Sequence, residues 1–155
     1  MTDSEFRGLR RAADYQFGDE GGAALFADAD ALDVTHTSSG RPRQVHAGDG
    51  RVATYGSDGR FRLGLAGGRR LLAAFDAPRH RVVVGDESEP FVREGRNAFA
   101  KFVQSADDGL RPGDETLVVH EDGDLLAVGR AELPGSGMGD FETGMAVKVR
   151  QGADD

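Results

Sequence analysis

The sequence predicts an α+β fold, in which a small N-terminal α/β domain with antiparallel strands is followed by a small β-barrel. Apolar residues recur at helical spacing in residues 4–17, and short alternating runs separated by turn residues extend from residue 34 to residue 65. In residues 79–152, many short strand patterns accompany one helical pattern, which is typical of a small closed barrel. The 155 residues, of which 38% are hydrophobic, suffice for two very small cores.

The first helix is predicted from the segment SEFRGLRRAADYQF at residues 4–17. Ser4 is available as an N-cap, and Gly18 follows the last apolar residue. Four apolar side chains share one face at helical spacing: Phe6, Leu9, Ala13 and Phe17.

Antiparallel strands joined by tight turns are predicted next. The runs VTHT, RQVHA, RVATYG and RFRLGL are separated by the turn segments SSGRP, GDG and SDG. GGRRLLAAF, which ends at Phe75, predicts a short helix. DAPRH then forms a linker, because Pro78 disfavours a helix at the residue before it. We therefore expect a first domain at residues 1–78 and a second at residues 79–152.

The second domain opens with RVVVGD, an apolar strand that ends in a turn. FVREGRNAFAKFVQSA follows, and its spacing predicts a helix on which Phe99, Phe102 and Val103 share one face. RPGDETLVVHEDGDLLAVGRAEL predicts two strands around the EDGD turn, and PGSGMGDFETG is a glycine-rich connection. MAVKVR predicts a final strand with Lys148 and Arg150 on one face.

The formal net charge of −8 is unevenly distributed along the chain. Residues 1–40 carry −5, residues 41–81 carry +6 and residues 82–155 carry −9. A cationic middle third is expected of a surface that binds a polyanion, although a row of solvated arginines would have the same sequence. The acids are eighteen Asp and nine Glu, which indicates halophilic adaptation to a salt-rich cytoplasm or the codon bias of a GC-rich genome.

Several classes of site find no support in the sequence. There is no cysteine, which excludes disulfides, thiolate metal sites and a cysteine nucleophile. The four histidines lack the i, i+4 spacing of zinc enzymes, and GSGMG lacks the spacing of a nucleotide-binding glycine motif. No run approaches the roughly 20 apolar residues of a membrane span, and the N-terminus has no apolar signal core. We therefore predict no metal, no cofactor, no catalytic residues and a cytoplasmic location.

The second half of the chain resembles a known RNA-binding module. The succession RVVV, VREGRNAFAKFV, LRPGDETLVVHEDGDLLAVGRAEL and GMAVKVR is similar to the PUA domain of pseudouridine synthases and archaeosine transglycosylases. The resemblance covers residues 79–152, and its most specific parts are RPGDETLVV, LLAVGRAEL and residues 144–150. It implies a β-barrel that binds RNA.

The first half resembles the domain that precedes PUA in archaeal tRNA-guanine transglycosylases and archaeosine synthases. The similar segments are ADYQFGDEGGAALF and SSGRPRQVHAGDGRVATYGSDGRFRLGLAGGRRLL. The chain would then correspond to the C-terminal RNA-binding portion of those proteins. The sequence contains no counterpart of their catalytic barrel, so the resemblance does not imply transglycosylase activity.

The resemblance also implies a binding surface. In PUA domains the RNA lies against the first helix, its glycine-containing loop and the last strand, with contacts mainly to phosphates and sugars. Gly95 is expected to let a backbone N–H approach a phosphate; the alternative is a turn glycine that needs no ligand, beside solvated cations. Transferred by position, the surface consists of Gly95, Arg96, Asn97, Lys101, Lys148 and Arg150.

Six arginines of the first half form a second candidate RNA surface. Two pairs of them are two residues apart, so each pair projects from one face if its segment is extended. A solubilising outer sheet face is the alternative interpretation. The six residues are Arg41, Arg43, Arg60, Arg62, Arg69 and Arg70.

Two functions from different classes agree with these observations. The first is an RNA-binding protein for structured tRNA, an accessory to archaeosine-type or pseudouridine-type modification by a catalytic subunit on another chain. It would recognise the shape and phosphates of an A-form stem and its 3′ end. The second is a protein-interaction scaffold, or a translation or ribosome-associated factor, that uses the barrel. An enzymatic site in the first domain ranks third.

Overall fold

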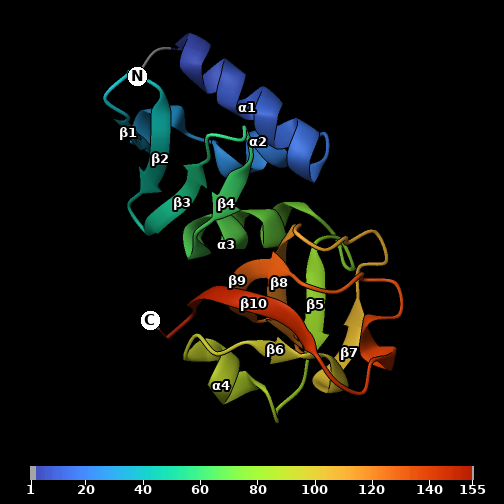
Figure 1. Cartoon of the computed structure of the whole chain (residues 1–155). Coiled ribbons are helices and arrows are strands. Elements are labelled where there is room, and N and C mark those ends of the chain that lie inside the picture. The colour runs from blue at the N-terminus through green and yellow to red at the C-terminus, as the bar shows by residue number, and fades with distance from the viewer. Residues whose placement is uncertain (1–2, 155) are drawn as a thin grey trace. The chain divides into compact units, whose positions relative to one another are not determined.

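The computed structural model describes residues 3–154, which belong to two compact units, Met1–Phe75 and Asp76–Asp155 (Figure 1). Each unit has its own sheet: four strands in the first and six in the second. Among residues 3–154, no helix is long and apolar enough to cross a membrane. The observed architecture confirms the predicted α+β fold class.

The first unit packs helices against an antiparallel sheet of order β1-β2-β3-β4. The predicted strands and both predicted helices are present, and a short helix, α2, was not predicted. The elements are α1 (Asp3–Phe17), α2 (Gly21–Leu25), the 3-10 turn η1 (Ala29–Ala31), β1 (Asp33–His36), β2 (Pro42–Ala47), β3 (Gly50–Tyr55), β4 (Phe61–Leu63) and α3 (Leu65–Ala74).

Helix α1 buries the face that the sequence predicted. Phe6, Leu9, Ala13 and Phe17 are all buried. The predicted N-cap is wrong, because the helix already contains Asp3 and therefore Ser4 lies inside it.

Two glycines let α2 lie directly against the backbone of α1. A Cβ at Gly22 would lie 2.3 Å from the carbonyl oxygen of Arg10, and a Cβ at Gly21 would lie 2.9 Å from that of Ala13. Such approaches exclude side chains, so this pairing requires glycine at both positions. Helix α2 therefore packs in direct backbone contact with α1 within the first unit.

The second unit is a nearly closed barrel with strand order β6-β10-β9-β8-β5-β7. The edge strands β6 and β7 are separated by only three residues of the chain, so the sheet must curl to bring its edges together. The elements are β5 (Arg81–Val84), α4 (Glu89–Arg93), β6 (Ala98–Phe99), the 3-10 turn η2 (Ala100–Phe102), β7 (Val103–Ala106), β8 (Glu115–His120), β9 (Leu125–Ala131), the 3-10 turn η3 (Met138–Asp140) and β10 (Met145–Gly152).

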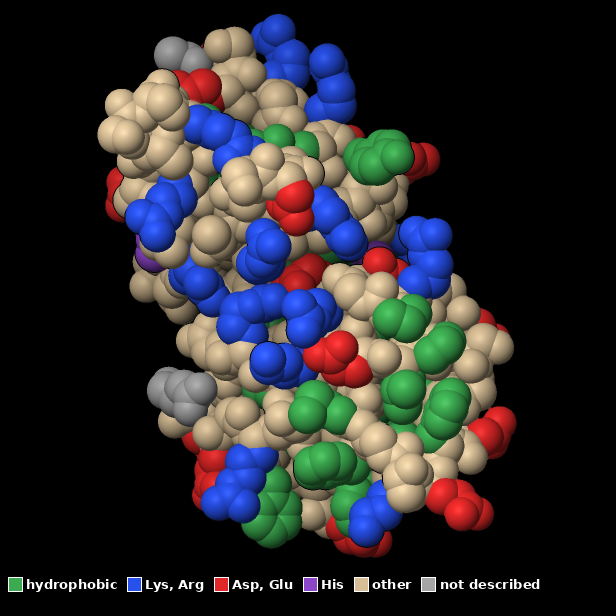
Figure 2. All heavy atoms as spheres, viewed as in Figure 1, with side chains coloured by type: hydrophobic (Ala, Val, Ile, Leu, Met, Phe, Trp, Pro, Cys, Tyr) green, Lys and Arg blue, Asp and Glu red, His purple; other side chains and the backbone are tan. Residues whose placement is uncertain are grey.

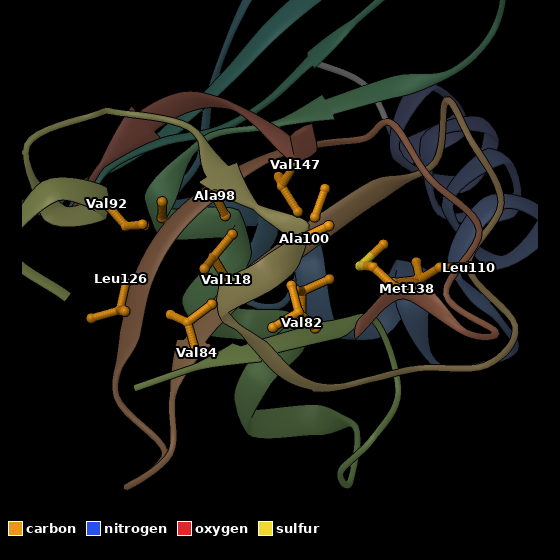
Figure 3. Close-up of a cluster of buried hydrophobic side chains, with 13 residues drawn as sticks. Val82, Val84, Val92, Ala98, Ala100, Leu110, Val118, Leu126, Met138 and Val147 are labelled. Atoms are coloured by element: carbon orange, nitrogen blue, oxygen red, sulfur yellow. The ribbon is translucent and has the colours of Figure 1, made fainter. Parts of the chain in front are cut away.

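Small aliphatic side chains from most of these elements fill the barrel (Figure 3). Val82 and Val84 come from β5, Val118 comes from β8, and Val147 comes from β10, and each is fully buried. Val92 extends this core to α4, which fixes the helix against the barrel wall.

The predicted helix across residues 91–106 is wrong. Helix α4 ends at Arg93, before Gly95, and the following residues form β6, η2 and β7. Phe99 is exposed and Val103 is buried, so they do not share a helical face. The reason is tertiary: β6 pairs with β10, which replaces the local helical preference with strand hydrogen bonds.

Candidate nucleic-acid interface

Gly95 ends helix α4 in a Schellman motif. Its φ of 100° lies in the left-handed region that glycine adopts without strain. The Gly95 N–H donates to the carbonyl of Val92 at 3.0 Å, and the Arg96 N–H donates to the carbonyl of Phe91 at 3.0 Å. Both backbone donors are therefore used inside the protein. The expected approach of a backbone N–H at Gly95 to a phosphate stays a prediction.

The side chain of Arg96 lies over the ring of Phe91, a residue of helix α4. Its guanidinium carbon lies 5.6 Å from the centroid of the Phe91 ring, a cation–π distance. Arg96 is 69% exposed, and its contact with Glu94 at 3.9 Å is a weak surface ion pair. The guanidinium therefore remains accessible to an anionic ligand.

An aromatic groove of about 430 Å³ adjoins Arg96. Phe91 and Phe99 line it and are 50% and 47% exposed, an uncommon exposure for large apolar rings. Figure 2 shows hydrophobic side chains beside basic ones at the surface over α4 and β6. The full lining is Glu87, Ser88, Phe91, Val92, Arg96, Asn97, Phe99 and Phe102.

Lys101 extends this arrangement of rings and cations. Its ammonium nitrogen lies 5.0 Å from the centroid of the Phe102 ring. Exposed aromatic faces next to guanidinium and ammonium groups offer stacking to a base and attraction to its phosphate. We call Phe91, Arg96, Phe99, Lys101 and Phe102 the aromatic groove set.

Asn97 has a structural role that its sequence position did not reveal. Its Oδ1 accepts the backbone N–H of Val149 at 2.9 Å, which ties the loop after Gly95 to β10. Val149 lies between Lys148 and Arg150, so this bond brings the loop to the basic part of the last strand. The predicted contact of Asn97 with RNA stays a prediction, and its Oδ1 is engaged within the barrel.

A second close contact fixes the same junction. A Cβ at Gly152 would lie 2.2 Å from the carbonyl oxygen of Arg93 and 2.6 Å from the nitrogen of Gly95. The end of β10 therefore lies directly against the end of α4, where only glycine fits. The two segments that the resemblance assigned to one surface are neighbours.

Lys148 and Arg150 differ in what they contact. Arg150 donates two hydrogen bonds of 2.7 Å to the carboxylate of Glu115, whose side chain is 5% exposed. Lys148 is exposed opposite Arg130 of β9, and no ion pair to another residue of 3–154 involves it. Lys148 thus has no ion pair within residues 3–154, whereas Arg150 is held by a buried acid.

The arginines of the first unit do not form one face. In β2, Arg43 lies two residues before Val45, so both side chains project from the same side of the sheet. Val45 pairs with Ala53 of β3, and Ala53 pairs with Leu63 of β4, so Leu63 projects from that side too. Arg62 precedes Leu63 and therefore projects from the other side of the sheet. Arg43 and Arg62 thus project from opposite sides of the sheet.

Most of the remaining arginines of this set have partners in their own unit. Arg41 stacks over Tyr55 at 4.6 Å and donates to the carbonyl of Gly56. Arg70 forms hydrogen bonds of 3.2 and 3.3 Å to Asp49, and the first of these contacts holds the pKa of that carboxyl below its usual value. Arg69 is exposed on α3.

Arg60 directly precedes β4 and Arg62 lies within it, both after the turn that contains Asp58. The Arg60 backbone N–H and, more weakly, the Arg62 guanidinium lower the pKa of Asp58. Arg62 lies 3.5 Å from that carboxylate, and its side chain is 49% exposed. Together these contacts make the first-unit set a weaker candidate than the aromatic groove set.

A group of carboxylates surrounds His120 at the end of β8. His120 Nε2 lies 2.7 Å from Asp86, and Nδ1 lies 3.0 Å from the carboxylate of Asp122. The Asp86 contact is the main cause that raises the pKa of His120. Ligand atoms of Asp86, His120 and Glu121 lie within 4.8 Å of one another, a grouping that sequence spacing did not indicate.

The aromatic groove is the part of the site that the sequence reasoning missed. The signal was present as three phenylalanines among residues 91–102, interleaved with Arg96 and Lys101. The pattern was interpreted as the buried face of a helix, whereas the short β6 strand turns Phe99 outward.

Family comparison supports this description of both units. Residues 7–78 match the model of the patch-forming domain C2 of tRNA-guanine transglycosylase, and residues 80–153 match the model of the PUA domain. The chain contains a PUA domain at residues 80–153. Its order of domains resembles the C-terminal portion of tRNA-guanine transglycosylases, which confirms the resemblance found in the sequence.

Curated relatives share this region at substantial identity. The tRNA-guanine(15) transglycosylase of Pyrococcus furiosus is 46% identical over 144 residues, which are 92% of this chain and 24% of the relative. That of Pyrococcus abyssi is 44% identical over 151 residues, which are 97% of this chain and 25% of the relative. The PUA domain protein thus spans about a quarter of the length of these relatives.

Solved structures show the same fold along the whole chain. The hypothetical protein PH0734.1 from Pyrococcus horikoshii OT3 aligns with a TM-score of 0.72 and 22% identity, covering 100% of this chain and 93% of that one. A conserved PUA domain protein from Thermoplasma acidophilum aligns with a TM-score of 0.65 and 21% identity, with the same coverage. These similarities establish the fold.

Proposed function

We propose that this PUA domain protein binds structured tRNA and presents it to a catalytic domain of the tRNA-guanine transglycosylase type. The observation that carries the proposal is the aromatic groove set, which combines exposed rings with accessible cations next to the basic end of β10. Relatives named tRNA-guanine(15) transglycosylase support tRNA as the RNA class.

The groove offers two kinds of contact to RNA. Arg96, Lys101 and Lys148 are positioned to bind phosphates, which supply affinity and register. Phe91 and Phe99 expose ring faces on which an unpaired base can stack, at a gain of about 1 to 3 kcal/mol per base. A duplex cannot offer such a base, so the groove favours a single-stranded end or loop beside a stem.

The binding test uses total tRNA and charge reversal at the groove. Arg96→Glu combined with Lys148→Glu should weaken binding strongly while the circular dichroism spectrum is retained, since both side chains are exposed. Each lost phosphate contact should also reduce the log-log salt slope by about 0.7 to 0.9. Phe99→Ser should weaken binding without changing that slope, because stacking releases no counterions.

Arg60→Glu combined with Arg62→Glu is the charge-matched comparison. It changes the net charge equally and leaves the groove intact. Loss of binding in this variant alone would move the RNA site to the first unit. Loss in neither variant, or no binding by the parent protein, would contradict the groove and favour the protein-interaction role.

A further inference from the structure

The basic residues of the first forty positions are concentrated on one helix. This segment contains eight acids and three bases, and the three bases are all in α1: Arg7, Arg10 and Arg11. Selection for an acidic composition alone would not concentrate the basic residues on one helix. The concentration indicates a local role for positive charge.

Two of these arginines and a tyrosine form one stripe along α1. Arg7, Arg11 and Tyr15 are each four residues apart, and four residues are slightly more than one helical turn. Arg7 and Arg11 are exposed, and Tyr15 is 95% exposed. Figure 2 shows basic side chains over α1 and a hydrophobic one towards its end. We call these three residues the α1 stripe.

The α1 stripe is not explained by contacts inside the protein. Within residues 3–154, neither Arg7 nor Arg11 forms an ion pair or a side-chain hydrogen bond. Two like charges at i, i+4 repel each other and destabilise a helix. The nearby Asp14 is engaged elsewhere, since its Oδ1 accepts the N–H of Gly22 at 2.7 Å. An external anion would remove this repulsion.

A hollow of about 490 Å³ lies along the same helix. Arg10 is fixed at its wall, because its guanidinium donates to the carbonyl of Phe26 at 3.2 Å and lies 5.7 Å from the Phe6 ring. Two carboxylates also contribute to the lining, so an anion would have to meet the guanidinium side of the hollow. The lining is Asp3, Phe6, Arg7, Arg10, Arg11, Asp14 and Ala29.

We infer that the α1 stripe is an RNA-binding surface of its own, which contacts phosphates through Arg7 and Arg11 and stacks a base or ribose on Tyr15. The inference rests on the proposed RNA-binding function and adds a contact surface on the first unit. Guanidinium groups bind phosphate oxygens bidentately, and a tyrosine exposed on both faces is suited to stacking. This combination distinguishes the stripe from a merely solvated helix face.

The experiment compares tRNA binding of the full chain and of variants of α1. Arg7→Glu combined with Arg11→Glu should reduce affinity about tenfold near 0.2 M salt and lower the salt slope by about 1.4 to 1.8, the loss of two phosphate contacts. The variant keeps a like-charge pair at i, i+4, so the helix itself should be little changed. Tyr15→Ser should weaken binding with an unchanged slope, whereas Tyr15→Phe should bind as the parent does.

A charge-matched control separates the stripe from net charge. Arg79→Glu combined with Arg111→Glu changes the total charge equally at two exposed positions outside α1 and outside both candidate RNA surfaces. The inference would be overturned if both double variants lost tRNA affinity equally. It would also be overturned if the α1 variants bound tRNA as tightly as the parent protein. If those variants bind normally while the groove variants do not, the stripe fails and the proposed function stands. A parent protein that does not bind tRNA overturns both.

Discussion

Two basic residues of β10 that are two positions apart have different roles. Lys148 is solvated, whereas Arg150 compensates the buried carboxylate of Glu115 through two short hydrogen bonds. Sequence alternation places both on one face and cannot tell them apart, because the distinguishing partner lies 35 residues away. At the residue scale, a cation's function depends on its partners more than on its position in a strand.

Arg150→Ala should therefore destabilise the protein more than Lys148→Ala. Removing the guanidinium leaves Glu115 charged and desolvated, which costs about 1.5 to 3 kcal/mol. Removing the exposed lysine should change the free energy of unfolding by less than about 0.5 kcal/mol. Urea denaturation of the two variants measures the difference, and equal stabilities would show that Glu115 remains solvated without its partner.

His120 should make stability dependent on pH. Hydrogen bonding to Asp86 raises the pKa of His120 in the folded state, so protonation favours folding. This contribution is complete below the unfolded pKa near 6.5 and is lost as pH rises through the higher folded pKa. The stability difference between the parent and His120→Gln should thus shrink as the pH rises above about 6.5. A difference that grows with pH would contradict the predicted shift.

At the element scale, the segment after Gly95 shows where local patterns fail. The spacing of Phe99, Phe102 and Val103 fits a helix, yet β6 exists because Ala98 pairs with Val147 across the sheet. The strands β1 to β4, by contrast, were predictable, since alternation and turn residues specify them locally. Nothing local indicates that Asn97 bonds β10, a contact that spans 52 positions.

The Schellman motif at Gly95 gives an element-scale prediction. A residue with a Cβ in the left-handed region costs about 1 to 2 kcal/mol, so Gly95→Ala should destabilise the protein by that amount. Gly95→Asn should cost less, because asparagine adopts this conformation more readily. Thermal unfolding of the two variants provides the measurement. Stability equal to the parent in Gly95→Ala would show that the loop rearranges without strain.

On the scale of the whole molecule, the chain combines two units with separate cores and separate cationic features. The aromatic groove set belongs to the second unit, and the α1 stripe belongs to the first. The sequence indicated two domains and a cationic middle, but the structure distributes the arginines of residues 41–70 over opposite sides of a sheet and over helix α3. Charge summed along a sequence therefore does not locate a binding surface.

The connection between the two units should be the first site of limited proteolysis. Residues 76–79 are exposed and separate the last helix of the first unit from β5. Brief trypsin treatment should cut after Arg79 and release a folded fragment that begins at His80, whose N–H is anchored to Asp107 at 2.8 Å. Mass spectrometry identifies the cut, and Arg79→Gln should abolish it. Initial cleavage within β5 or β9 would contradict a junction near Pro78, because those strands belong to the barrel wall of the second unit.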